Sequence, residues 1–326
     1  MADYKAIKGH HIETVAGDPS VLQAGDIWYN STLGKVRGAK LAAGAWASGG
    51  SMNTNRNLMG TAGTQTAGSI FGGGPHPKTV HEYYDGSSWT EVADINTARL
   101  SGFGDGTQTA SFLASGSDAT SSPRAFDETE IWNGTSWTEV ADLGTARYGA
   151  AGCGTTTAAL GFGGYSGPET TTDYKIVESY DGSSWTEIAD MNTARQFLGG
   201  VGIQTAALAI SGTTDGGGSA SATSEEWNGT AWAEGNNMNA ARYYPGAAGI
   251  QTAALAFGGG APPQVDSTEE YDGTSWVEVA NLSTARYTLK GAGTQTSALA
   301  AGGPPPVGTA TEEWDKSVTA SSLTSS

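Results

Sequence analysis

The sequence predicts an all-β chain whose larger part is a six-bladed β-propeller. One observation is a repeated unit, YDGSSWTEIADMNTAR at 180–195, with close copies at 84–99, 132–147 and 271–286 and a looser copy at 227–242. A second is its spacing, because the arginines that close successive units lie 43 to 48 residues apart. A third is composition, since 49 glycines and 15% charged residues favour short strands and tight turns over long helices. Four short strands in each unit of this length are typical of propellers.

Each unit divides into four predicted strands. The arginine is followed by a Gly/Ala-rich segment, such as RYYPGAAGIQT at 242–252, and then by an apolar segment, such as AALAFGGG at 253–260. A variable loop leads to a third strand that ends in Glu-x-Tyr or Glu-x-Trp. Asp-Gly or Asn-Gly then provides the positive φ angles of a tight hairpin. A tryptophan strand, such as SWTEIAD at 184–190, completes the unit.

The ends of the repeat region predict how the ring closes. The last unit lacks a tryptophan strand, whereas AGAWASGGSMNTNR at 43–56 is a tryptophan strand without a unit of its own. If this N-terminal strand completes the last blade, no sheet edge stays open. We therefore expect an N-terminal attachment segment with a short hairpin at 1–42, the propeller at 43–316, and a flexible tail at 317–326.

Three residue types mark the repeat. We expect the arginines and glutamates to form a buried hydrogen-bonded ring and the tryptophans to fill the gaps between outer strands. The alternative is a sugar pocket in every unit, with the arginine and glutamate around the hydroxyls and the indole on the sugar face. Retention of all three in regular strands favours packing. The residues are Arg56, Arg99, Arg147, Arg195, Arg242 and Arg286; Glu82, Glu130, Glu178, Glu225, Glu269 and Glu312; and Trp46, Trp89, Trp137, Trp185, Trp232 and Trp276.

Two resemblances follow from these residues. The order Arg, Gly-Gly, Glu-x-Tyr-Asp and then Trp resembles the kelch repeat over about residues 43–316. GDIWYNSTLGKVRG at 25–38 is similar to a short hairpin of bacteriophage tail-fibre and other virion proteins, and the repeats resemble kelch-like proteins of phage particles. The resemblance implies a non-enzymatic structural protein at the virion surface, as a tail fibre, tail or capsid appendage. It also implies an oligomeric assembly, attachment to other virion proteins through the N-terminal segment, and binding of a host-surface glycan.

Charge and composition exclude several partners. A net charge of −17 would repel the phosphates of nucleic acid. The absence of an apolar run of membrane-spanning length predicts no membrane insertion. The single cysteine, Cys153, excludes an internal disulfide, and we expect it to be a buried small residue. His10 and His11 could ligate a metal, but adjacent histidines near a terminus favour a mobile surface pair, so we expect no metal and no cofactor.

Two other classes of function stay open. The first is a carbohydrate-active enzyme or a galactose-oxidase-like propeller. Its copper site would need more histidines than His10, His11, His76 and His81, and a tyrosine partner for Cys153. A sialidase Asp-box also fails on spacing, and near-identical units offer no single asymmetric catalytic constellation, so we expect no enzyme. The second is an intracellular kelch scaffold that binds a protein partner.

The variable loops between the second and third strands are the better candidates for recognition, because a rigid scaffold presents them on one face. Their alternative interpretation is that such loops simply tolerate change. The loop residues able to stack on a ligand or to hydrogen-bond with it are His76, Lys78, Arg124, Phe126, Tyr165, Tyr174 and Lys175.

Overall fold

The computed structural model describes residues 12–118, 125–167, 172–216, 219–260 and 263–323. Throughout these residues the regular elements are β-strands. The described part of the chain holds no helix with the length and apolarity that a membrane crossing requires. The chain divides into two compact units, a larger one at 46–314 and a smaller one made of 1–45 and 315–326.

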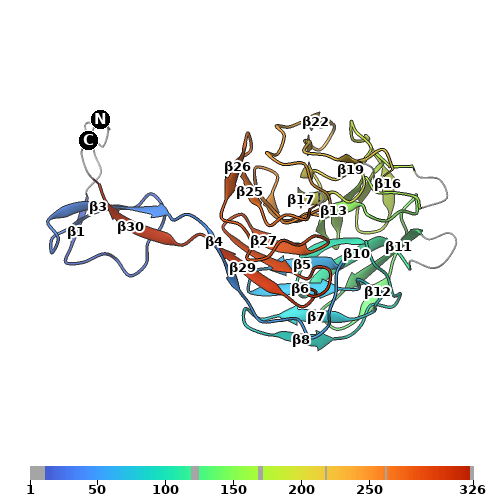
Figure 1. Ribbon diagram of the computed structural model, residues 1–326, viewed down its shortest axis with the longest axis horizontal. Coiled ribbons are helices and arrows are strands. Elements are labelled where there is room, and N and C mark those ends of the chain that lie inside the picture. The colour runs from blue at the N-terminus through green and yellow to red at the C-terminus, as the bar shows by residue number, and fades with distance from the viewer. Residues whose placement is uncertain (1–11, 119–124, 168–171, 217–218, 261–262, 324–326) are drawn as a thin grey trace. The chain divides into compact units, whose positions relative to one another are not determined.

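The larger unit contains six four-stranded sheets within the described residues, numbered here sheet 1 to sheet 6 along the chain (Figure 1). Sheet 1 contains β5 (Gly60–Thr64), β6 (Ala67–Phe71), β7 (His81–Tyr84) and β8 (Trp89–Val92), and sheet 2 contains β9 (Phe103–Thr107), β10 (Ala110–Ser117), β11 (Ala125–Trp132) and β12 (Trp137–Glu139). Sheet 3 contains β13 (Ala151–Thr155), β14 (Ala158–Phe162), β15 (Val177–Tyr180) and β16 (Trp185–Glu187). Sheet 4 contains β17 (Gly199–Ile203), β18 (Ala206–Ile210), β21 (Ser224–Trp227) and β22 (Trp232–Glu234), with a short ribbon of β19 (Thr213–Thr214) and β20 (Ser219–Ala220) in its central connection.

Sheet 5 contains β23 (Gly246–Ile250), β24 (Ala253–Phe257), β25 (Thr268–Tyr271) and β26 (Trp276–Val279). Sheet 6 joins the two ends of the unit, because β27 (Lys290–Thr294), β28 (Ser297–Ala301) and β29 (Thr311–Asp315) are followed in the sheet by β4 (Ala45–Ser48). Figure 1 shows this strand in blue beside the red β29. The N-terminal tryptophan strand therefore lies where the incomplete last repeat lacks its own.

The hairpin between the third and fourth strands has the turn chemistry that its sequence predicts. In sheet 3, Gly182 has a φ of 95°, which an L side chain rarely adopts. The carboxylate of Asp181 accepts hydrogen bonds from the backbone N–H groups of Ser183 and Ser184, both at 2.8 Å. These bonds favour the ionised carboxylate and lower the pKa of Asp181. Both residues of the Asp-Gly pair therefore have a structural role in the turn.

The hydrophobic core lies between successive sheets. One cluster joins Leu160 and Phe162 of sheet 3 to Trp227 and Trp232 of sheet 4. Another joins Ile70 and Tyr84 of sheet 1, together with Met59 just before β5, to Leu299 and Ala301 of sheet 6. Because neighbouring sheets cover both faces of a sheet in this way, the first two strands have room mainly for small side chains.

Glycine makes the close approach of neighbouring sheets possible. A Cβ atom on Gly200 of sheet 4 would lie 2.7 Å from the ring of Phe162 and 2.8 Å from the Cβ of Ala151, both in sheet 3. The first strands also lie side by side, β5 with β9, β9 with β13, β13 with β17, β17 with β23, β23 with β27, and β27 with β5. This succession of four-stranded antiparallel sheets is consistent with a β-propeller.

The smaller unit is one four-stranded sheet in the order β1 (Glu13–Val15), β2 (Ile27–Asn30), β3 (Lys35–Leu41) and β30 (Val318–Ser322). The β2–β3 hairpin lies within the segment 25–38 that resembles virion proteins. Asp18 organises this sheet, because its carboxylate accepts hydrogen bonds from Trp28 (3.2 Å), Asn30 (2.9 Å) and Arg37 (2.8 Å).

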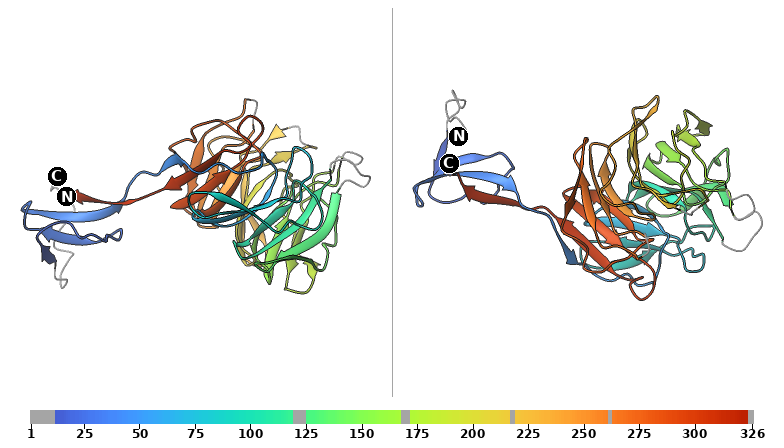
Figure 2. Two further views of the ribbon diagram at one scale, coloured as in Figure 1. Left: turned by 90° about the horizontal axis from the view of Figure 1, so that it is seen from below. Right: turned by 45° about the horizontal axis from the view of Figure 1, so that its top comes forward.

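The C-terminal segment differs from the flexible tail expected at 317–326. Residues 318–322 form β30, which pairs antiparallel with β3 from Arg37 opposite Ser322 to Leu41 opposite Val318. Figure 2 shows the red C-terminal strand beside blue N-terminal strands. The pairing satisfies the backbone groups on the second edge of β3, which β2 cannot reach. Both ends of the chain therefore build the smaller unit.

Candidate ligand-binding site

The arginine and glutamate of the repeat form an ion pair in every sheet of the larger unit. The N···O distances lie between 2.5 and 3.3 Å, and the side chains are at most 4% exposed. Burial lowers the pKa of each arginine, and the paired glutamate opposes that shift. A sugar could not touch these groups unless the sheets separated. The geometry favours the structural interpretation of this set over a sugar pocket in every unit.

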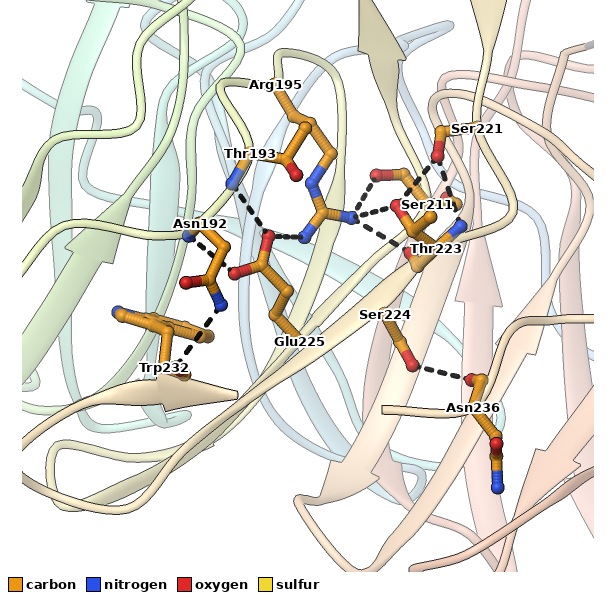
Figure 3. Close-up of polar contacts among 10 residues, drawn as sticks. All are labelled: Asn192, Thr193, Arg195, Ser211, Ser221, Thr223, Ser224, Glu225, Trp232 and Asn236. Carbon is orange, nitrogen blue, oxygen red and sulfur yellow. Dashed lines mark hydrogen bonds and ion pairs between the residues drawn. The ribbon is translucent and has the colours of Figure 1, made fainter. Parts of the chain in front are cut away.

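Arg195 shows what the pair does (Figure 3). Its guanidinium donates to Glu225 at 2.9 Å and to the carbonyl oxygens of Ser211 and Thr223 at 3.0 and 2.9 Å. The carboxylate of Glu225 also accepts from the backbone N–H of Asn192 at 2.7 Å. The segment N-T-A-R between sheets 3 and 4 is thus fixed onto sheet 4 by charge-assisted hydrogen bonds.

In four of the six sheets the indole of the fourth-strand tryptophan hydrogen-bonds to the sheet before it, whereas the indole N–H groups of Trp232 and Trp276 have no partner within the described residues. The indole of Trp185 in sheet 3 donates to the hydroxyl of Thr129 in sheet 2 at 3.0 Å. Trp89 of sheet 1 donates in the same way to Thr311 of sheet 6, also at 3.0 Å. In sheet 2 the acceptor is a histidine, since Trp137 donates to Nδ1 of His81 at 3.0 Å.

The seven predicted loop residues do not form one cluster. His76 and Lys175 are exposed, and Lys175 pairs with Asp190 at 3.3 Å. Phe126 packs on the guanidinium of Arg99, whose Cζ lies 5.7 Å from the ring centroid. Lys78 and Tyr174 are half-buried, Tyr165 is buried, and Arg124 lies outside the described residues.

A second set of residues, two positions after each repeat arginine, surrounds the axis of the larger unit. The backbone N–H of each donates to the carbonyl of its equivalent in the preceding sheet, and Leu58 donates to Thr288, so that the six bonds form a cycle with distances of 2.7 to 3.2 Å. Every member has a φ between 51° and 66°. The members are Leu58, Ser101, Gly149, Phe197, Tyr244 and Thr288. We call this set the axial ring.

Backbone strain concentrates in the axial ring. A non-glycine residue at positive φ costs about 1–3 kcal/mol, and a β-branched residue such as Thr288 is a marked exception. Such a conformation persists only where surrounding bonds impose it, and the cycle of hydrogen bonds does so here. The side chains of the axial ring differ from sheet to sheet, in contrast to the arginines and tryptophans.

Aromatic side chains gather at one side of the axial ring. Phe197 and Tyr244 stack with centroids 4.1 Å apart and planes 23° apart. Tyr148 lies 6.5 Å from Phe197 and 5.2 Å from Tyr165, which is one of the predicted loop residues. Tyr243 and Tyr287 adjoin Tyr244 at 5.7 and 6.5 Å. These six residues, Tyr148, Tyr165, Phe197, Tyr243, Tyr244 and Tyr287, form what we call the aromatic cluster.

The aromatic cluster lies on the side of the variable loops. The residue after five of the six repeat arginines bridges to the start of a central connection, as Tyr148 does with Tyr165 and Tyr243 with Gly260. All members except Tyr165 are half-buried, so parts of their rings remain accessible. Half-buried aromatic faces with phenol hydroxyls at their edges can stack on an apolar surface and donate hydrogen bonds.

Beneath the axial ring, cavities follow the axis between the first strands. One, of about 10 Å³, is lined by the axial ring together with Lys290, and the next, of about 50 Å³, by Lys290, Thr61 and Phe103. A third, of about 80 Å³, is lined by Asp105 and by backbone of all six first strands. Desolvation raises the pKa of Asp105 to about 6 and lowers that of Lys290 to about 8.

Within the described ranges, no group of three or more His, Cys, Asp and Glu side chains is placed to hold a metal ion. Cys153 is buried, as expected, and burial raises its pKa well above the ordinary value. Apart from Tyr165, the members of the axial ring and of the aromatic cluster were not among the predicted site residues. Their signal was present in the sequence, because the two positions after each repeat arginine read NL, LS, YG, QF, YY and YT within an otherwise uniform unit.

Comparisons with known proteins locate the fold and leave the function open. No protein-family model matches the chain, and no curated protein matches it. Among solved structures, that of YjhT aligns with a TM-score of 0.66 and 14% sequence identity, over 83% of this chain and 99% of that chain. YjhT is a β-propeller protein. Together with the four-stranded antiparallel sheets, this likeness is consistent with a β-propeller fold.

Proposed function

We propose that the larger unit is a closed, six-bladed, kelch-like propeller that displays a glycan-binding face. The blade number is supported by the six sheets within the described residues, and closure by the position of β4 in sheet 6. The cycle of hydrogen bonds in the axial ring, in which Leu58 donates to Thr288, supports the same conclusion. The kelch-like assignment is supported by the Arg, Gly-Gly, Glu-x-Tyr-Asp and Trp order of the repeat.

The same proposal includes a non-enzymatic role at the surface of a phage particle. The smaller unit supports it, because this unit carries the virion-like hairpin and several exposed apolar side chains, among them Val21 (77%), Leu33 (52%) and Ile27 (41%). Exposed apolar side chains on this unit are available for contacts with a partner protein. They would attach the chain to other virion proteins in an oligomeric assembly, as a tail fibre, tail or capsid appendage.

The observation that carries glycan binding is the aromatic cluster. It lies on the side of the variable loops, it interrupts a sequence that otherwise repeats, and it joins stacked rings to phenol hydroxyls. Sugars expose apolar C–H faces and hydroxyl edges, and this combination of groups complements both. The backbone of Phe197 and Tyr244, fixed at positive φ in the axial ring, holds the stacked pair in place. These two side chains therefore lose little conformational entropy when a ligand binds.

The test is a glycan array followed by calorimetric titration of the best glycan. The variant Phe197→Asn/Tyr244→Asn removes the stacked pair but keeps residues that tolerate positive φ. We expect at least a tenfold loss of affinity, which is about 1.4 kcal/mol. Tyr29→Asn in the smaller unit is the matched control and should bind as the wild type does. An array without a hit, or equal affinity of the double variant, would contradict glycan binding at this cluster.

Particle attachment has a separate test. Antibodies raised against the larger unit should label intact virions in electron micrographs of particles that contain the protein. The chain without residues 1–42 and 317–326 should no longer associate with particles when it is supplied during assembly. Labelling confined to lysed cells, or association that does not need these segments, would contradict the role as an appendage.

A further inference from the structure

Lys290 differs from its equivalents in the other five sheets. The residue four positions after each repeat arginine is Gly60, Phe103, Ala151, Gly199 or Gly246 in sheets 1 to 5, and lysine only in sheet 6. Its side chain is half-buried, and it lines both the cavity at the axial ring and the larger cavity beneath it. No hydrogen bond or ion pair reaches its ammonium group from any residue in the described part of the chain.

The surroundings of Lys290 call for a negative charge. The ammonium group of the half-buried Lys290 has lost part of its hydration without gaining a partner in the described protein, and desolvation alone accounts for its low pKa, about 8. Each first strand is the end strand of its sheet, so one edge of its backbone faces the axis without a strand partner. Unpaired N–H groups on such edges need water or a ligand. An anion in the cavity could satisfy the ammonium group and these donors together.

The charge and volume of the cavities limit the anion. Lys290 is the single cation among the lining residues, which balances one negative charge and offers no second cation for a phosphate dianion. A water molecule needs about 10–15 Å³ of such space, so 50 Å³ admits a group of a few atoms and excludes a complete sugar ring. A carboxylate has the appropriate size, charge and number of acceptor sites.

We infer that the axial cavity below the aromatic cluster is a monocarboxylate-binding site, in which Lys290 forms the ion pair and backbone N–H groups of the first strands complete the contacts. This site is additional to the proposed glycan-binding face, and the argument for it depends only on the cavity and the residues that line it. The carboxylate could belong to a small free acid, or to an acidic sugar whose ring remains on the aromatic cluster while its carboxylate enters the axis.

The groups that face this cavity set its dependence on pH. The titratable residues among those lining the three axial cavities are Lys290, Asp105 and Tyr244. Burial raises the pKa of Tyr244 well above its ordinary value, so the phenol stays neutral. Asp105 ionises above about pH 6 and then adds a like charge to that of the ligand. The ligand carboxylate itself is ionised only above about pH 5. Binding should therefore be strongest between about pH 5 and pH 6 and should be lost as Lys290 deprotonates above about pH 8.

The first experiment titrates the full chain with sodium acetate at constant ionic strength, with sodium chloride as the balance. Lysine side chains labelled with ¹⁵N report the pKa of Lys290 by NMR. We expect saturable binding and a rise of about one unit in this pKa, which corresponds to a tenfold preference of acetate for the charged amine. Unchanged pKa and no saturation would overturn the site, and equal effects of chloride alone would overturn its assignment to a carboxylate.

Variants separate binding from stability. Lys290→Met keeps the length of the side chain and removes the charge, and we expect it to melt at or above the wild-type temperature but to gain no stabilisation from acetate. Lys40→Met removes an exposed lysine of the smaller unit and is the matched control, which should respond to acetate as the wild type does. Acetate stabilisation that persists in Lys290→Met would overturn the assignment.

A comparison of ligands identifies the source of the carboxylate. Glucuronate that binds at least tenfold more tightly than acetate, and loses that advantage in Phe197→Asn/Tyr244→Asn, would show an acidic sugar that uses both surfaces. Acetate binding with no advantage for glucuronate would show a small free acid. In both cases acetate binding depends on Lys290, so failure of the glycan array does not remove this site.

Discussion

At the scale of single residues, His81 replaces a threonine in one joint between sheets. In three other joints the tryptophan indole donates to a threonine hydroxyl, as Trp185 does to Thr129 and Trp46 to Thr268, both at 3.0 Å. Nδ1 of His81 accepts from Trp137 instead, which requires the neutral ring, and Nε2 bonds with Ser69 at 2.7 Å. Burial lowers the pKa of His81 to about 3. The joint therefore resists protonation.

The variant His81→Thr should change the acid stability of the protein. The pKa of His81 is about 3 in the folded state and about 6.5 in the unfolded state, so the unfolded chain gains the proton first as the pH falls. Stability from this group is present above pH 6.5 and is lost toward pH 3, at up to about 1.4 kcal/mol per pH unit. Urea denaturation between pH 7 and pH 4 should give a shallower decline for His81→Thr. His76→Thr, at an exposed position, should keep the wild-type slope, and parallel curves for all three proteins would contradict this account.

At the scale of elements, a glutamine in the turn between the first and second strands connects five of the six sheets to the one before it. Gln204 of sheet 4 donates to Ser179 and to the carbonyl of Tyr180 in sheet 3. Gln251 of sheet 5 donates in the same way to the carbonyl of Trp227 in sheet 4, at 2.7 Å. Sheet 3 lacks this contact, because its turn reads GTTT and has Thr156 at the glutamine position. A threonine side chain is too short to reach the carbonyl group of the preceding sheet.

The variant Thr156→Gln should therefore stabilise the joint between sheets 2 and 3. Its amide would lie next to the carbonyl of Trp132, which ends the third strand of sheet 2 as Tyr180 does in sheet 3. A net hydrogen bond contributes about 0.5–1.5 kcal/mol. The midpoint of chemical denaturation should rise without a change in slope. Thr156→Leu controls for added bulk, and an equal rise in that variant would show that packing, and no hydrogen bond, is responsible.

The strands were largely predictable from the sequence, but the contacts among the residues around the axis were not. Trp, Glu-x-Tyr and Asp-Gly recur at fixed offsets, so each third and fourth strand could be located from local pattern and turn chemistry alone. The positive φ of Tyr244 and the stacking of its ring on Phe197 depend on residues of two sheets, and no local pattern encodes such contacts. Lys290 reads as an ordinary surface lysine until the topology puts its strand at the axis.

At the scale of the whole molecule, the chain ends take part in two different sheets. β4 completes sheet 6 of the larger unit, while β30 pairs with β3 in the smaller one. The orphan tryptophan strand at 43–56 predicted the first of these pairings. The second escaped prediction because SVTASSLTSS is a polar, low-complexity sequence without a hydrophobic pattern, and its partner strand lies at the other end of the chain.

The position of β4 leads to a prediction about stability. Without β4, sheet 6 loses its fourth strand, the edge of β29 is unpaired, and Trp46 no longer packs against Phe257 and Trp314, whose centroids lie 4.8 and 5.4 Å from it. Loss of a packed tryptophan alone costs about 3–5 kcal/mol, which corresponds to a fall of roughly 10 °C in Tm at this chain length. The chain 49–316 should therefore melt at least that far below the chain 43–316.

A peptide separates this effect from simple shortening. A synthetic peptide of residues 42–50, added to the chain 49–316, should restore Tm in a concentration-dependent way, because a ligand that binds only the folded state stabilises by mass action. The same peptide with Trp46→Ala should restore much less, since it can pair with β29 but cannot fill the space beside Phe257. Circular dichroism melts follow all four samples. If the chains 49–316 and 43–316 have the same Tm, or if both peptides raise Tm equally, the stability of the larger unit does not depend on the tryptophan strand.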